Sequence, residues 1–151
     1  MPVNVRRAKP ADAAIVAEFN RLMALETENK VLDPKVLAQG VAAVLADSNK
    51  GFYLVAEIDG TVAGQIGITM EWSDWRNGWF WWIQSVYVRA SSRRLGVFRT
   101  LYERVYRLAH EDGNVIGLRL YVEENNHAAQ ETYRRLGMER MNFLLFHRWP
   151  M

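Results

Sequence analysis

The sequence predicts a single α/β domain over residues 1–151, with a mixed β-sheet and helices on both of its faces. Two turn signals, Asp59-Gly60 and Asn77-Gly78, separate three strand-like segments and predict an antiparallel meander. After the third segment the hydrophobic period changes to that of a helix over 95–113 and then returns to that of a strand. A strand–helix–strand unit of this kind predicts two parallel strands joined by a right-handed crossover.

The first half of the chain is predicted to contain a short strand, two helices and the meander. Residues 3–7 form the strand, and Pro10 suits the first turn of a helix whose apolar residues recur at helical spacing up to Met23. Asp33 is expected to cap the second helix, and Pro34 to occupy its first position. The meander strands are predicted at 52–58, 61–72 and 79–88.

The second half is predicted to alternate helices and strands. A helix begins near Leu95 and ends near Gly113, and a strand follows over 115–122. The next helix runs from Asn126 to Leu136 and is closed by a glycine. A last strand is predicted over 141–149, which gives the order β-α-α-β-β-β-α-β-α-β.

The composition excludes several kinds of chemistry. Because the chain has no cysteine, group transfer must use another nucleophile or pass directly between bound substrates. The net charge is +2, and the one dense basic cluster, 89–99, is too short for a nucleic-acid groove. No segment is apolar enough for a membrane span or a signal peptide, and the three histidines lack metal-ligand spacing. We therefore expect a cytoplasmic protein without a metal and without a nucleic-acid or membrane partner.

The stretch RRLGVFRT, residues 93–100, lies between a predicted strand and a predicted helix. Unpaired amides at a helix N-terminus, together with the helix dipole, suit an anion. Arginines add charge-assisted contacts to phosphate, and Gly96 permits close approach of the backbone. Taken alone, however, a helix start rich in arginine fits a solvated surface better.

Two motifs decide between these alternatives. The segment from Val88 resembles motif A of the GNAT N-acetyltransferases, V-x(4)-[RQ]-x-x-G-x-[GA], with Phe98 at the last small position. Further on, the chain resembles the second signature of that family, V-x(3)-N-x-x-A-x(3)-Y-x(3)-G-[FM]. The matching residues are Val88, Arg93 and Gly96 in the first motif and Val122, Asn126, Ala129, Tyr133, Gly137 and Met138 in the second. The resemblance covers nearly the whole chain and implies the GNAT fold and acetyl-CoA as co-substrate.

The resemblance also implies where acetyl-CoA binds. The sheet is expected to splay after Val88, so that pantetheine pairs with a freed strand edge over 86–88, and the pyrophosphate is expected over the amides of 94–99. The side chain of Phe98 must then point away from the phosphates. The implied cofactor-binding residues are Val86, Tyr87, Val88, Arg93, Arg94, Leu95, Gly96, Val97, Phe98, Arg99, Asn126, Ala129 and Tyr133.

Acetyl transfer to an amine needs an acid and a base, because an amine with a pKa of about 10.4 is only about one part in 2,500 neutral at pH 7. Tyr133 matches the tyrosine general acid of the family; the alternative is a helix tyrosine packed on the core. Gln84 or Trp82 stands where many relatives carry a glutamate base. Glu71 or Asp74 could replace that base or orient a water, or could be solvated loop charges.

The acceptor is predicted to be a small-molecule primary amine, polyamine-like or amino-acid-like. Five of the six tryptophans lie in or beside one hairpin, where they could bind a cation or could simply pack. A weaker resemblance to the diamine N-acetyltransferases suggests that Glu26 and Glu28 face the amine, although a solvated helix end explains them equally well. The predicted acceptor-binding residues are Glu26, Glu28, Asp74, Trp82 and Gln84. The alternatives are a peptide N-acetyltransferase and a silent acetyl-CoA sensor, and similar enzymes imply a homodimer.

Overall fold

The computed structural model describes residues 2–151, which divide into two compact units, Met1–Leu120 and Tyr121–Met151. The single domain predicted over 1–151 stays a prediction. The elements of the first unit are β1 (Asn4–Arg7), the 3₁₀ turn η1 (Pro10–Asp12), α1 (Ala13–Glu28), α2 (Pro34–Ala46), β2 (Phe52–Ile58), β3 (Thr61–Ser73), β4 (Gly78–Val88), η2 (Ala90–Ser92), α3 (Val97–Asp112) and β5 (Val115–Leu120). Their order confirms the prediction as far as β5.

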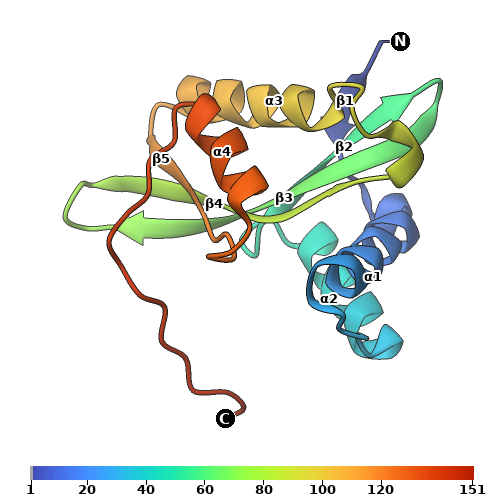
Figure 1. The fold of residues 1–151 in the computed structure, drawn as a ribbon, viewed down its shortest axis with the longest axis horizontal. Coiled ribbons are helices and arrows are strands. Elements are labelled where there is room, and N and C mark those ends of the chain that lie inside the picture. The colour runs from blue at the N-terminus through green and yellow to red at the C-terminus, as the bar shows by residue number, and fades with distance from the viewer. Residues whose placement is uncertain (1) are drawn as a thin grey trace. The chain divides into compact units, whose positions relative to one another are not determined.

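The first unit is a five-stranded sheet in the order β1-β2-β3-β4-β5, with α1 and α2 on one face and α3 on the other (Figure 1). The pairs among β1 to β4 are antiparallel, and β4 and β5 are parallel, as predicted. Asp59 and Gly60 both have positive φ, 51° and 77°, as a two-residue hairpin turn requires.

Different strands pair with the two ends of the β3–β4 hairpin. β2 pairs with the first part of β3, up to Ile68, whereas β5 pairs with the first part of β4, from Trp79 to Ile83. A bulge separates the two regions, because Ile68 pairs with Ile83 and Gly67 with Ser85, which leaves Gln84 unpaired. The two strands therefore part after Ile83, five residues before the predicted position at Val88. Among residues 2–120, no strand pairs with this edge of β4 after Ile83.

Both faces of the sheet are held by close packing. On the α1 and α2 face, Val16, Val41 and Val55 form a buried cluster. On the same face, Asn20 of α1 joins the buried Gln65 and Ser85 through hydrogen bonds of 3.1 and 2.7 Å. On the other face, α3 presents buried residues at a spacing of four, namely Val97, Leu101, Val105 and Ala109.

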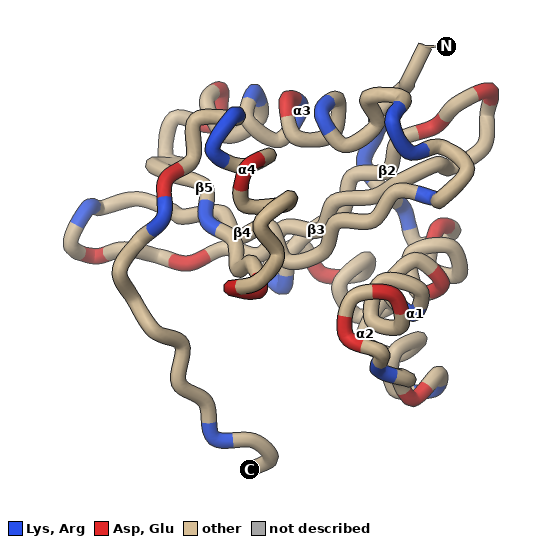
Figure 2. Tube along the Cα trace, in the orientation of Figure 1, with Lys and Arg blue, Asp and Glu red and all other residues tan. Residues whose placement is uncertain are grey.

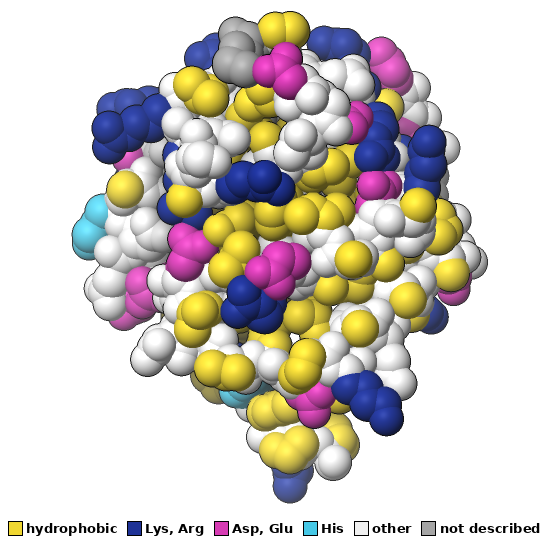
Figure 3. Space-filling view, turned by 90° about the vertical axis from the view of Figure 1, so that its right-hand side faces the viewer, with side chains coloured by type: hydrophobic (Ala, Val, Ile, Leu, Met, Phe, Trp, Pro, Cys, Tyr) yellow, Lys and Arg dark blue, Asp and Glu magenta, His cyan; other side chains and the backbone are white. Residues whose placement is uncertain are grey.

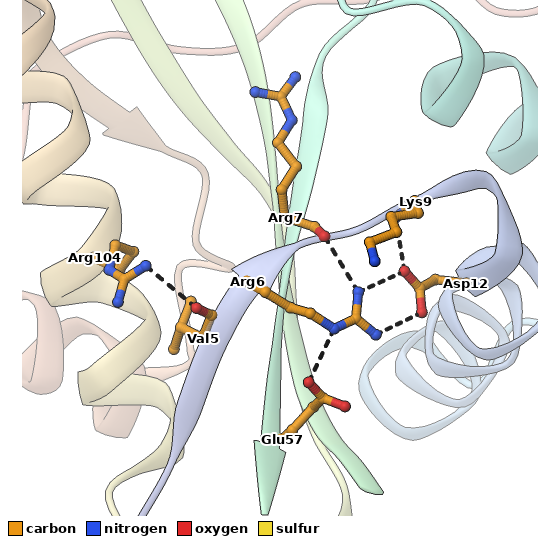
Figure 4. A network of polar contacts seen from close by, with 7 residues as sticks. All are labelled: Val5, Arg6, Arg7, Lys9, Asp12, Glu57 and Arg104. Atoms are coloured by element: carbon orange, nitrogen blue, oxygen red, sulfur yellow. Dashed lines mark hydrogen bonds and ion pairs between the residues drawn. The ribbon is translucent and has the colours of Figure 1, made fainter. Parts of the chain in front are cut away.

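Arg6 ties the N-terminal strand to both of its neighbours (Figure 4). Its guanidinium donates to both carboxylate oxygens of Asp12, at 2.8 and 2.9 Å, and to Glu57 at 2.9 Å. The hydrogen bond from Arg6 holds the pKa of Asp12 below its usual value. Asp12 also accepts from the backbone N–H of Lys9, so β1, η1 and β2 share one polar junction.

The helix ends follow the capping signals of the sequence. Asp33 accepts from the amides of Lys35 and Val36, as predicted for the start of α2. Helix α3 begins at Val97 instead of near Leu95, because Gly96, in the left-handed region at φ 79°, cannot belong to a right-handed helix. It ends at Gly113, as predicted.

The second unit contains one helix, α4 (His127–Arg135), and a C-terminal segment without regular structure. Asn126 caps α4 by accepting from the amide of Ala129. The strand predicted over 141–149 is wrong, because the structure gives these residues no regular secondary structure. A hydrophobic segment becomes a strand only where a neighbouring edge pairs with it, and local sequence cannot supply that edge.

No helix within residues 2–151 has the length and apolar character that crossing a membrane requires. On the face drawn in Figure 3, side chains of both charges interrupt the hydrophobic surface, in keeping with a net charge of +2.

Gly64 allows α3 to approach the sheet closely. A methyl group there would lie 2.9 Å from Cγ1 of Val97 and 3.0 Å from the carbonyl oxygen of Tyr87. We expect Gly64→Ala to lower the free energy of unfolding by about 1–3 kcal/mol through overpacking. Urea unfolding measures this change.

Gly40→Ala is the matched control, because Gly40 lies within α2 and a methyl group there meets nothing within 4 Å. This substitution should raise the free energy of unfolding by up to about 1 kcal/mol. Equal effects of the two substitutions would contradict the close approach of α3 to β3.

Candidate functional site

A cleft of about 630 Å³ opens where the end of β4 turns into α3. One wall comes from the last turns of α1, and the other comes from the β4 edge and the first turn of α3. The lining residues are Met23, Glu26, Thr27, Val86, Tyr87, Val88, Ser92, Arg93, Arg94, Gly96, Val97, Phe98 and Arg99. The structure thus gathers the predicted motif residues of this unit, with Leu95 in the same turn, around one cavity.

The turn between β4 and α3 has an unusual backbone. Arg94 and Gly96 both have positive φ, 67° and 79°, and a non-glycine residue in this region is uncommon. No protein acceptor within residues 2–151 pairs with the amides of Arg94, Leu95, Gly96, Val97 and Arg99. Such donors, together with the positive end of the helix dipole, suit an anion.

Arginines add positive charge around this turn, where Figure 2 shows blue segments leading into α3. Arg93 is held in place: it donates to the carbonyl of Val88 at 2.9 Å and to Glu26 at 2.8 Å. Arg99 pairs with Glu103 at 2.9 Å on the exposed surface of α3. The side chain of Arg93 is therefore bound to other groups of the protein and is not freely solvated.

Glu26 links helix α1 to the far side of the cleft. Its carboxylate accepts from the Tyr87 hydroxyl at 2.6 Å as well as from Arg93. These two hydrogen bonds, with that from Tyr87 the larger cause, lower the pKa of Glu26. Burial, and secondarily Glu26, raises the pKa of Tyr87. The carboxylate predicted to face an amine is thus engaged with the chain's own side chains.

The remaining cleft residues occupy two kinds of position. Val86 and Val88 lie on the part of β4 that β5 no longer covers, so their backbone forms the free edge. Phe98 lines the cleft from the first turn of α3, and its ring lies 6.2 Å from that of Tyr102. The bulky side chain at the last motif position thus forms part of the cleft wall.

A second group of side chains lies where β4 and β5 are still paired. Glu71 accepts from the indole N–H of Trp82 at 2.9 Å and from Arg119 at 3.1 Å. The Arg119 guanidinium lies 3.5 Å from the ring centroid of Phe80, so the cation on this ring belongs to the protein. Trp81 packs on Phe52 instead, because alternation along β4 divides its aromatic residues between the two faces of the sheet.

The other predicted acceptor residues lie apart from these contacts. Gln84, at the bulge, donates to the hydroxyl of Thr69 at 3.1 Å. Asp74 lies in the exposed loop between β3 and β4, and Glu28 lies at the exposed end of α1.

The second unit carries Asn126, Ala129 and Tyr133. Asn126 caps α4 through its side-chain oxygen, and Ala129 contributes only its backbone amide, so the cap accounts for the asparagine but not for the alanine. Burial raises the pKa of Tyr133, so its phenol is protonated at neutral pH. Among residues 2–151, no three His, Asp or Glu side chains are grouped to hold a metal ion.

Sequence reasoning missed Arg119 and the partners of Glu26. Arg119 stands in β5 directly opposite Trp82, so the parallel register, had it been known, would have placed it beside the tryptophans. The contacts of Glu26 join residues 61 and 67 positions apart, and no local pattern signals them.

The fit to coenzyme A rests on three structural observations. The unpaired amides suit a pyrophosphate, the arginines suit phosphate charge, and the freed edge of β4 has backbone groups available for an amide-containing arm. Residues 18–138 match the Acetyltransferase (GNAT) family. The chain belongs to this family.

Solved structures agree with this assignment. The chain is similar to a possible acetyltransferase from Clostridium difficile 630, with 42% identity, a TM-score of 0.94, and coverage of 100% of this chain and 99% of that one. A ribosomal-protein-alanine N-acetyltransferase from Brucella melitensis biovar Abortus 2308 has 15% identity, a TM-score of 0.80, and coverage of 99% and 100%. An aminoglycoside acetyltransferase from an uncultured soil metagenomic sample has 15% identity, a TM-score of 0.76, and coverage of 99% and 96%. The last two share the fold alone, and no match was found among curated proteins.

Replacing Glu26 by glutamine should lower stability at neutral pH but not in acid. Because folding lowers the pKa of Glu26, its stabilisation is present above the ordinary value of 4.5 and is lost as the pH falls through the folded-state pKa. The urea midpoints of wild-type and Glu26→Gln chains should differ at pH 7 and converge as the pH falls below 4.5 and through the folded-state pKa.

Glu28→Gln is the control for this measurement. Glu28 is the next acidic residue on α1, and its side chain has no hydrogen bond or ion pair within residues 2–151. If the urea midpoints of both variants changed equally with pH, the contacts of Glu26 would contribute nothing to the free energy of unfolding.

Proposed function

We propose that the chain is an acetyl-CoA-dependent N-acetyltransferase that moves an acetyl group directly to the primary amine of a small molecule. The observation that carries this proposal is the turn at 94–99, with its unpaired amides and left-handed Gly96, beside the free edge of β4. Arg93, Arg94 and Arg99 supply positive charge for the phosphates.

Acetyl-CoA supplies the acetyl thioester; the reaction forms an N–C bond and breaks the C–S bond. The protein's part is to remove a proton from the ammonium group of the acceptor and to protonate the departing sulfur. Tyr133 carries the second role in this proposal. Its raised pKa keeps the phenol protonated at pH 7 and makes proton donation more costly than from an ordinary tyrosine.

Glu71 is the first residue to test as the base or as the group that orients a water. Two donors, Trp82 and Arg119, hold its carboxylate in place, and about half of the side chain is exposed. The same face of the β3–β4 hairpin is where the acceptor would approach.

The contacts of Glu26 with Tyr87 and Arg93 bear on which class of acceptor the protein uses. A polyamine site on α1 would use this carboxylate, but it already accepts from Tyr87 and Arg93. This supports an amino-acid-like acceptor over a polyamine.

The cofactor site can be tested with two glycines that flank α3. Acetyl-CoA at about 100 times its Kd should add about 2.7 kcal/mol to the free energy of unfolding, which corresponds to an increase in Tm of about 5–10 °C. Gly96→Ala should at least halve this increase, because a side chain would crowd the amides that face the phosphates. Differential scanning fluorimetry measures both effects.

Gly113→Ala is the matched control: both glycines have φ near 80° and both have open space at the Cβ position. The backbone strain is therefore similar, while only Gly96 lines the cleft. If acetyl-CoA leaves the Tm of the wild-type chain unchanged, the proposed function is wrong.

Tyr133→Phe should lower kcat by about 10²- to 10⁴-fold while the Kd for acetyl-CoA stays within about twofold, because only proton donation is lost. Release of free CoA, followed with a thiol reagent, gives the rate. Tyr106→Phe is the control, since Tyr106 is an exposed tyrosine of α3. An unchanged kcat in Tyr133→Phe would exclude Tyr133 as the acid, and CoA binding without any turnover would favour the silent sensor.

A further inference from the structure

Arg119 and Glu71 lie at the point where the sheet opens. Arg119 pairs in register with Trp82, and the next pair, Ile83 with Leu120, is the last before the strands part. Glu71 lies on the adjacent strand, and its Oε1 atom accepts from both Arg119 and Trp82. The arginine and the glutamate therefore form a charged pair immediately before the free edge of β4 begins.

These side chains share the face of the sheet that α1 covers further along. Alternation along β3 places Gly67, Thr69 and Glu71 on one face. The ring of Tyr53 lies over Gly67, and its hydroxyl accepts from Asn20 of α1, which identifies this face. An acceptor that approaches the strand opening from the α1 face would thus meet Glu71 and Arg119.

The Arg119 guanidinium is fixed before any ligand binds. It lies 3.5 Å from the Phe80 centroid and donates to Glu71, and its side chain is only 22% exposed. Gly117, which pairs with Phe80, leaves room for that ring: a methyl group there would lie 2.8 Å from Cε1 of Phe80. A planar guanidinium that is already ordered loses little entropy when it binds a carboxylate.

Arg119 and Glu71 can each make further hydrogen bonds. Glu71 is the one hydrogen-bond partner of the Arg119 guanidinium within residues 2–151, so further N–H donors of the five are available. The structure likewise gives Oε2 of Glu71 no donor within the same residues. A ligand with an ammonium group and a carboxylate close together complements such a pair, whereas a second cation would be repelled by Arg119.

We infer that Arg119 and Glu71 form the acceptor subsite, in which Arg119 binds a carboxylate and Glu71 receives the neighbouring ammonium group. The acceptor is then an amino acid or another amino carboxylate, and Arg119 is the residue that determines this specificity. This inference rests on the proposed acetyl transfer. A purely structural ion pair at the surface would leave the choice of acceptor unaffected.

Matched acceptors test the subsite. Lysine and cadaverine, and phenylalanine and phenethylamine, differ within each pair by the carboxylate alone, and kcat/KM is measured for each at saturating acetyl-CoA. Wild-type enzyme should prefer the amino acids, and Arg119→Gln should reduce that preference by about 10- to 100-fold. The decisive quantity is the ratio of kcat/KM for the amino acid to kcat/KM for the matched amine, compared between the wild-type and variant enzymes. The two acceptors have different amine pKa values, but this difference affects both enzymes equally and cancels.

Arg76→Gln is the control. Arg76 also lies over Phe80, at 5.6 Å, but makes no ion pair with Glu71, so its loss should leave the preference unchanged. Arg119→Lys keeps the charge without the planar donor pair and should retain part of the preference. It replaces Arg119→Gln in the comparison if the latter does not fold, as judged by its urea midpoint.

The outcomes separate the subsite from the proposed function. Equal or better use of the amines by wild-type enzyme, or a preference that neither Arg119 variant reduces, overturns the subsite. Acetylation of peptides alone also overturns it. A wild-type chain whose Tm does not respond to acetyl-CoA overturns the proposed acetyl transfer itself, whereas a normal response together with preference for amines removes only the subsite.

Discussion

The parting of β4 from β5 after Ile83 is the constraint on which the rest of the site depends. A strand inside a sheet uses its backbone groups on both edges, and only a strand that loses a neighbour can offer one edge to a ligand. The bulge at Gln84 marks this change, because it bends β4 where β5 no longer follows. Upstream of the bulge lie Arg119 and Glu71, and downstream lies the turn with its unpaired amides.

A second set of contacts fixes the orientation of that turn. Glu26 of α1 holds Tyr87 and Arg93 from across the cleft, and Gly64 allows the first turn of α3 to lie against β3. The negative charge of Glu26 offsets that of Arg93, whereas the amides of the turn at Arg94, Leu95 and Gly96 have no acceptor within residues 2–151. The ion pair and hydrogen bond of Glu26 thus hold the turn from the α1 side of the cleft, and the packing of α3 on Gly64 holds it from the other side.

Local signals predicted what is local. The hairpin turn at Asp59-Gly60 and the Asp33 cap depend on a few adjacent residues, and both are confirmed. The position of the strand opening depends on a bulge and a parallel register, and Arg119 acquires its partners only through that register. The strand predicted over 141–149 is absent, and local sequence cannot supply the neighbouring edge that a strand requires. Sequence motifs indicated acetyl transfer, but they carry no information about side chains that meet through the fold.

The division of the sheet also bears on the order in which the protein folds. The strands β2, β3 and β4 are joined by short turns, so their pairing closes small loops, whereas β5 must return across the whole of α3 to reach β4. Loop-closure entropy delays such non-local pairing. The meander therefore assembles first, and β5 docks on it late. On this order, the opening between β4 and β5 forms only when β5 docks on the meander.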